Sequence, residues 1–144
     1  MKRFDIKMNE KFFLRFVMAI LGTGNDLNAK VVSIAFRDSG FEIVYLGDNN
    51  TPDEIVRAAL QEDVDAIYLS VPEKSSVNLI KETLDIAKNS NFFDSSKKFI
   101  FAGGVDLSND EIQKLKDYGL TEIYRPSKKT HEIVENILKL FENN

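Results

Sequence analysis

The chain contains no cysteine and a single histidine, His131. Without cysteine it forms no disulfide and offers no thiolate as a metal ligand or as a nucleophile. One histidine leaves little scope for acid–base catalysis or for a metal site built on imidazole. The absence of cysteine also suits the cytoplasm, where we expect this protein to reside.

Long apolar runs and charge of a single sign are also missing. No stretch approaches the roughly 20 apolar residues that a membrane-spanning helix needs. Acidic and basic residues are interleaved to a net charge of −4, whereas binding to nucleic acid relies on clustered Lys and Arg. Residues 1–11 form a polar lead-in without the apolar core of a signal peptide. We therefore expect neither a membrane nor a nucleic acid as partner.

Five apolar segments alternate with five amphipathic ones along the 144 residues. The apolar segments are typical of strands buried on both faces, and they cover residues 12–21, 41–46, 66–70, 99–102 and 122–124. The amphipathic segments are typical of helices, and they cover residues 29–39, 52–62, 76–89, 109–118 and 130–141.

Local sequence patterns also predict where helices begin and which of their faces are buried. Thr51 with Glu54, and Ser108 with Glu111, have the spacing of capping boxes at helix starts. The apolar spacing predicts the inward faces of the first two helices, namely Val31, Val32, Ala35 and Phe36 in the first and Ile55, Val56, Ala59 and Leu60 in the second.

Strict alternation with short links forces parallel strands joined by right-handed crossovers. We therefore expect one domain over residues 1–144 with an α/β, flavodoxin-like (Rossmann-like) fold. It would be a three-layer sandwich around a five-stranded parallel sheet of order 2-1-3-4-5. Ligands of such sheets bind at the carboxyl ends of the strands. That edge collects residues 22–28, 47–50, 70–75, 103–107 and 125–129.

Other functions of this architecture find little support at that edge. A phosphoacceptor receiver domain needs an aspartate where the third strand ends, and Ser70 stands there. The loop 22–25 resembles a flavin phosphate loop only faintly and has no aromatic residue to stack on a flavin. Ser70 has no histidine near it in the sequence to act as a base. A hydrolase would therefore need a histidine that the fold brings close to Ser70. The glycines of the edge also fit ordinary tight turns.

Four segments follow the order and spacing of a known family. They read AKVVSIAFRDSGFEIVYLG, TPDEIVRAALQEDVDAIYLS, FAGGV and YGLTEIYRP. Together they resemble the cobalamin-binding domain of methylmalonyl-CoA mutase and related acyl-CoA mutases, over roughly residues 12–141. In some organisms that domain is a separate small subunit. The resemblance implies cobalamin as cofactor, isomerase chemistry that belongs to the cofactor, and a mutase-type large subunit as partner.

The family's cofactor motif, D-x-H-x-x-G, follows its first strand. Its histidine binds cobalt from below, its aspartate orients that histidine, and its glycine makes room for the cofactor tail. The resemblance aligns Thr23 with the aspartate, Asn25 with the histidine and Asn28 with the glycine, so all three positions are changed. The loop is also one residue short.

The remaining cofactor positions match in part. The resemblance assigns cofactor contacts to Gly22, Gly24, Ser70, Gly103, Gly104 and Pro126, besides the three motif positions. Pro72 replaces the leucine of the family's S-x-L motif, and Arg125-Pro126-Ser127 replaces its G-P-G.

Two functions follow from these residues. The first is a homologue of a mutase small subunit that has lost its axial histidine. Use of cobalamin is then open, and binding with the cofactor's own base on cobalt remains compatible with the sequence. The second is a cofactor-free module for protein interaction, or for a small-molecule ligand at the same edge. We assign neither a catalytic residue nor a metal ligand to the chain.

Overall fold

Five parallel strands form one sheet in the order β2-β1-β3-β4-β5. The computed structural model describes residues 14–24, 27–94 and 97–143. The strands are β1 (Arg15–Ile20), β2 (Glu42–Gly47), β3 (Ala66–Ser70), β4 (Phe99–Gly103) and β5 (Glu122–Tyr124). The strand order and the parallel pairing predicted from the sequence are confirmed.

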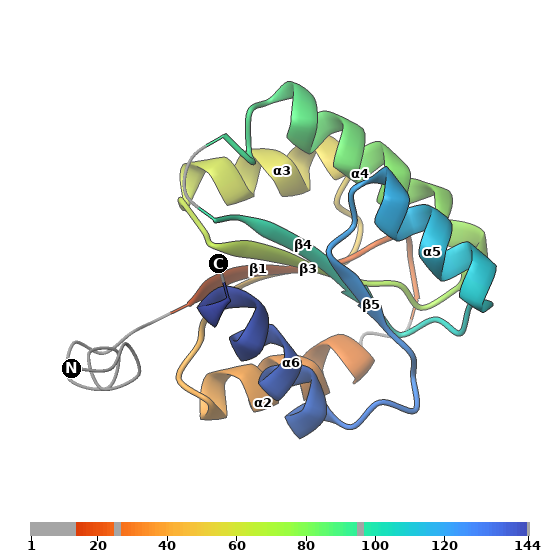
Figure 1. Ribbon diagram of the computed structural model, residues 1–144. Coiled ribbons are helices and arrows are strands. Elements are labelled where there is room, and N and C mark those ends of the chain that lie inside the picture. Colours follow the sequence, from red (N-terminus) through yellow and green to blue (C-terminus); the bar gives the residue numbers. More distant parts are fainter. Residues whose placement is uncertain (1–13, 25–26, 95–96, 144) are drawn as a thin grey trace.

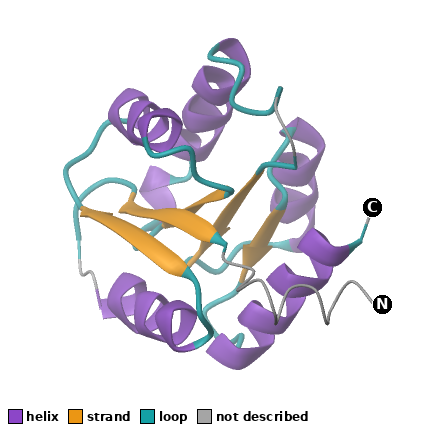
Figure 2. Cartoon of the chain, turned by 90° about the vertical axis from the view of Figure 1, so that its left-hand side faces the viewer, coloured by secondary structure: helices purple, strands orange, loops and turns teal. Residues whose placement is uncertain are grey.

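Helices cover both faces of the sheet and complete the expected three layers (Figures 1 and 2). On one face lie α2 (Leu27–Asp38) and α6 (Thr130–Glu142). On the other lie α3 (Pro52–Gln61), α4 (Asn78–Asn89) and α5 (Asn109–Tyr118). Among the described residues, no helix is long and apolar enough to cross a membrane.

Each face of the sheet has its own apolar core. The core under α3, α4 and α5 is aliphatic for the most part. The core under α2 and α6 is aromatic, and its rings come from Phe16, Phe36, Phe41, Tyr68, Phe101, Tyr124 and Phe141. The Phe36 and Tyr68 rings meet edge-on with centroids 5.5 Å apart, a preferred geometry for aromatic pairs. The aromatic core reaches the site discussed below through Tyr68.

The carboxyl ends of β1, β3, β4 and β5 are aligned. Ile20 pairs with Ser70, Ser70 with Gly103, and Gly103 with Tyr124. The loops that follow these strands therefore leave the sheet at one level and meet helix amino termini there. This is the edge where the sequence predicts a site.

Both capping boxes are confirmed, at Thr51 with Glu54 and at Ser108 with Glu111. The expected start of one helix and the expected burial of two helix residues are wrong. The helix expected from residue 76 begins at Asn78, because a 3₁₀ turn, η1 (Lys74–Ser76), precedes it. Val31 and Leu60 were expected to face inward and are exposed. Neighbouring elements cover other residues of the two helices, namely Ala29, Val32, Ser33 and Phe36 on α2 and Pro52, Ile55, Val56 and Ala59 on α3. The expected strand residues 12 and 13 lie outside the described residues.

Candidate functional site at the carboxyl edge

The first turn of α2 meets the ends of β3 and β4 at the carboxyl edge. The Ser70 hydroxyl donates a hydrogen bond of 3.2 Å to the Asn28 side-chain oxygen. Gly104 has φ of +98°, and a Cβ there would lie 3.2 Å from the same Asn28 oxygen and 3.1 Å from the Val71 carbonyl oxygen. Asn28, Ser70 and Gly104, each predicted as a site residue, therefore come together. Asn28 is exposed, and its side-chain oxygen lies between the other two residues.

Beneath this contact, the space beside Gly103 is filled by Tyr68. A Cβ on Gly103 would overlap the Tyr68 hydroxyl oxygen and would lie 3.2 Å from the adjacent ring carbon, Cζ. The Tyr68 ring is buried at 1% exposure and lies parallel to the Tyr124 ring with centroids 6.4 Å apart. The ring is held from both sides and cannot swing away freely. The space beside Gly103 is thus occupied by the Tyr68 side chain of this protein.

The glycines of the first loop are also closely approached. A Cβ on Gly22 would overlap the Ser76 hydroxyl, and one on Gly24 would lie 3.0 Å from the Pro72 side chain. Thr23 is exposed. Asn25, which the resemblance was expected to place at the axial histidine, lies outside the described residues. In the direction that a Cβ would take, all four glycines predicted to accommodate the cofactor therefore face atoms of this chain, although Thr23, Gly24 and Asn28 are exposed.

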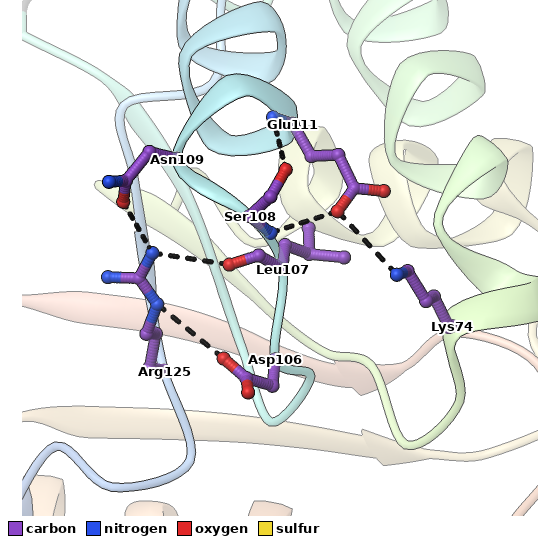
Figure 3. Close-up of polar contacts among 7 residues, drawn as sticks. All are labelled: Lys74, Asp106, Leu107, Ser108, Asn109, Glu111 and Arg125. Atoms are coloured by element: carbon purple, nitrogen blue, oxygen red, sulfur yellow. Dashed lines mark hydrogen bonds and ion pairs between the residues drawn. The ribbon is translucent and has the colours of Figure 1, made fainter.

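Polar contacts tie the outer loops of the edge together (Figure 3). The Arg125 guanidinium, after β5, donates to the Leu107 carbonyl oxygen at 3.2 Å and to the Asn109 side-chain oxygen at 2.7 Å. Its Nε lies 3.5 Å from an Asp106 carboxylate oxygen. Arg125 thus connects the loop after β5 to the loop after β4. Pro126, next to it, is exposed.

The start of α5 carries a second set of contacts. The Glu111 carboxylate accepts a hydrogen bond of 2.9 Å from the Ser108 backbone amide and lies 3.6 Å from the Lys74 ammonium. The Ser108 amide lowers the pKa of Glu111 most, and the Ser108 hydroxyl and Lys74 add to that effect. These residues cap a helix and bridge two loops, and this is a sufficient structural role for each of them.

The two buried tyrosines are held neutral. Burial raises the pKa of Tyr68. Burial also raises the pKa of Tyr124, and the nearby Tyr68 and Glu122 add to that rise. The Tyr124 hydroxyl donates to the Asn136 side-chain oxygen at 2.5 Å. Neither phenol is therefore poised to act as an acid or a base near neutral pH.

A cavity of about 450 Å³ lies beside the edge strand β5 and the start of α6. Its lining is polar and carries both signs of charge, from Glu122, Tyr124, Arg125, Ser127, Lys128, Glu132 and Asn136. His131 is exposed in the first turn of α6 and does not line this cavity. Within the described ranges, no three His, Cys, Asp or Glu residues gather as a metal site would require.

Sequence reasoning missed Tyr68 as a site residue, although a signal was present. Side chains alternate between the two faces of a strand, so Tyr68 and Ser70 share a face of β3. A large ring two residues before Ser70 must therefore lie beneath that serine, towards α2. Ser76 carried no comparable signal, because its approach to Gly22 depends on the 3₁₀ turn.

Comparisons with known proteins support the family resemblance. A sequence model of the B12 binding domain matches residues 16–134. The 2-hydroxyisobutanoyl-CoA mutase small subunit of Aquincola tertiaricarbonis is 27% identical over 88% of this chain and 91% of its own length. The fused isobutyryl-CoA mutase of Cupriavidus metallidurans is 34% identical over 78% of this chain, which spans only 10% of that protein.

A solved structure shares the fold at lower sequence identity. It is a cobalamin-binding protein from Desulfitobacterium hafniense, with a TM-score of 0.73 and 18% identity. The match covers 89% of this chain and 59% of that one. At this identity the likeness concerns the fold alone.

Proposed function

The chain belongs to the family of B12 binding domains, and we propose that it is a mutase small-subunit homologue that does not hold cobalamin through a histidine. In this proposal it contributes a folded module to an assembly of the acyl-CoA mutase type. The chain itself carries no catalytic residue, and any isomerisation belongs to a partner.

The observation that carries this proposal is the filled space at the carboxyl edge. Tyr68 takes the room beside Gly103, and Asn28 takes the room between Ser70 and Gly104. A ligand tail that entered between these residues would have to displace a buried aromatic ring. Displacing a packed core ring forfeits its burial, and the loss of a large aromatic core side chain typically costs about 3–5 kcal/mol.

The chemistry of Asn25 supports the same proposal. Imidazole binds a metal through a nitrogen lone pair, which an asparagine amide lacks. If Asn25 stands at the axial histidine, as the resemblance implies, the protein has no nitrogen ligand for cobalt at that position. Asn28, at the motif's glycine, adds a side chain where the family leaves space.

The small-subunit relative supports the proposed partner. Its match covers 88% of this chain and 91% of that subunit. A mutase-type large subunit is therefore the partner we propose. The substrate of such an assembly is not assigned.

Titration with hydroxocobalamin and adenosylcobalamin tests the proposal. Visible absorbance reports a change in cobalt ligands, and gel filtration reports retained pigment. We expect an unchanged spectrum and colourless protein at concentrations of about 100 µM, which would detect any affinity of that order or tighter.

Two other outcomes would overturn the proposal in different ways. Retained pigment with the cofactor's own base still on cobalt would show that the edge accepts the cofactor without a histidine. Retained pigment with a new nitrogen ligand would show that another residue replaces the histidine, and His131→Ala would then test the one histidine of the chain.

The cavity beside β5 favours a second candidate function, the binding of a small polar ligand. Its 450 Å³ lies within the range of ligand sites, about 300–1,000 Å³. Lys128 and Glu132 would contact groups of opposite charge on one molecule. Ligand-observed NMR with zwitterionic fragments tests this candidate, and Lys128→Ala should abolish any specific signal.

A further inference from the structure

Helix α2 carries a second apolar face that no described residue covers. Of the five exposed large hydrophobic residues in the described chain, three lie on this helix. Leu27, Val31 and Ile34 are exposed by 62%, 46% and 55%. Their spacing of four and three residues places them in one row along the helix. We call these three residues the α2 row.

A cavity of about 320 Å³ runs between α2 and the edge strand β2, beside this row. Ile34 and Tyr45 form apolar walls, and Ser33 also lines the cavity. The Ser33 hydroxyl is buried and has no hydrogen-bond partner among the described residues. The cavity therefore has room for one large side chain, and a polar tip on that side chain would satisfy the hydroxyl.

Two cations border the same cavity. Lys30 and Arg37, two helical turns apart, both line it. The Arg37 guanidinium has no hydrogen bond or ion pair with any described residue. A neighbouring cavity of about 270 Å³ brings Arg37 next to Glu42, but the Glu42 carboxylate already lies 2.8 Å from Arg15. This flank is therefore basic on a chain whose net charge is −4.

We propose that the α2 row and its basic flank form a docking surface for an amphipathic helix of a partner protein. The apolar side chains of that helix lie along the row, and one of them enters the cavity between Ile34 and Tyr45. Carboxylates on one side of the helix pair with Lys30 and Arg37. This is the recognition of an amphipathic helix through anchors at helical spacing. It uses none of the residues that close the carboxyl edge and does not depend on the proposed function.

Charge argues against two other occupants. In an antiparallel two-fold pairing of α2 with α2 of a second copy, the same flank faces itself, so the cations Lys30 and Arg37 would face the same two cations of that copy. Residues 1–13, which lie outside the described residues, contain four basic and two acidic side chains. Their net positive charge also fails to match the basic flank. An acidic partner matches it.

A pair of synthetic peptides tests the proposal with the full chain. Both are amphipathic helices of about 18 residues with leucine at helical spacing, and one carries glutamate on its flank where the other carries lysine. Fluorescence anisotropy gives the affinity, and amide shifts in ¹⁵N NMR spectra locate the contact. We expect the acidic peptide to bind and to shift the amides of α2.

Matched variants test the α2 row and its basic flank separately. Val31→Asp should abolish binding, whereas Leu60→Asp, an equally exposed site on α3, should leave it unchanged. The pair Lys30→Glu and Arg37→Glu should weaken the acidic peptide about tenfold and favour the basic one. All these positions are exposed, and circular dichroism checks that each variant is folded.

Several outcomes would overturn the proposal. They are equal binding of both peptides, amide shifts confined to other elements, and no shift at millimolar peptide. Concentration-dependent dimerisation that Val31→Asp abolishes would assign the surface to a second copy. Acidic-peptide binding that appears only after removal of residues 1–13 would assign it to that segment.

Discussion

Gly103 is the residue whose neighbourhood decides how the carboxyl edge is interpreted. If the Tyr68 hydroxyl occupies the space beside it, Gly103→Ala must force the ring to move and should destabilise the protein by about 1–3 kcal/mol. Tyr68→Phe removes the overlapping oxygen and should relieve part of this cost, since the ring carbon 3.2 Å away remains. Urea denaturation of both single variants and the double variant measures the coupling.

A coupling energy of at least about 0.5 kcal/mol is expected for residues in direct contact. Gly119→Ala provides a comparison, because its added Cβ would meet the flexible end of Lys88 and should show no coupling to Tyr68→Phe. Additive effects of Gly103→Ala and Tyr68→Phe would mean that the ring lies elsewhere.

The two buried tyrosines give a pH dependence that can be measured directly. Burial raises the pKa of Tyr68 and of Tyr124 in the folded state, while the unfolded value is about 10. Neutral phenols therefore stabilise the folded state fully below pH 10, and this stabilisation is lost as the pH rises above it.

Phenolate absorbance should accordingly show two of the four tyrosines ionising only when the protein unfolds at alkaline pH. Tyr68→Phe and Tyr124→Phe should each remove one of these late ionisations. Four tyrosines that ionise together while circular dichroism remains native would contradict the burial of this pair.

At the same scale, the sequence predicted where site residues gather but not what fills the space between them. Asn28, Ser70 and Gly104 follow from strand ends and one helix start, which parallel pairing brings to one edge. The overlap of Tyr68 with Gly103 depends on ring orientation inside the aromatic core. That orientation results from packing against Phe36 and Tyr124, which no local pattern encodes.

Among the elements, α5 offers a test of a boundary that the sequence predicted correctly. The Ser108 hydroxyl accepts a hydrogen bond of 3.1 Å from the Glu111 amide at the helix start. Ser108→Ala should destabilise the protein by about 1 kcal/mol, because that amide loses its acceptor. Ser75→Ala, at an exposed position of the 3₁₀ turn η1, should cost much less. Equal urea midpoints for the two variants would contradict this role of the cap.

Helix faces were harder to predict than helix ends. A cap is a local contact over three residues, so a sequence pattern contains it. The side of a helix that is buried depends on what lies against it. Val31 has the spacing of an inner residue, yet the sheet and α6 cover only Ala29, Val32, Ser33 and Phe36. The docking surface proposed for α2 lies on the face where the pattern was misleading.

For the molecule as a whole, the sequence pattern predicts the fold but not the ligand. Alternating strands and helices predict the parallel sheet and its order, because connection length and handedness leave few other arrangements. The family match over residues 16–134 agrees with that fold. The fold does not imply the family's ligand, since binding depends on particular side chains at the edge. Here those side chains include Asn28 and Tyr68, which fill space.

The most direct measurement compares cobalamin retention by the wild type and by a variant with an opened edge. The variant combines Asn25→His, Asn28→Gly and Tyr68→Ala, and circular dichroism first checks that it is folded. Asn25→His with Asn28→Gly serves in its place if the larger change unfolds the chain. After gel filtration with hydroxocobalamin, we expect colourless wild type and a coloured variant whose spectrum shows a nitrogen ligand from the protein. Stoichiometric pigment on the wild type would contradict the claim that its own side chains close the edge.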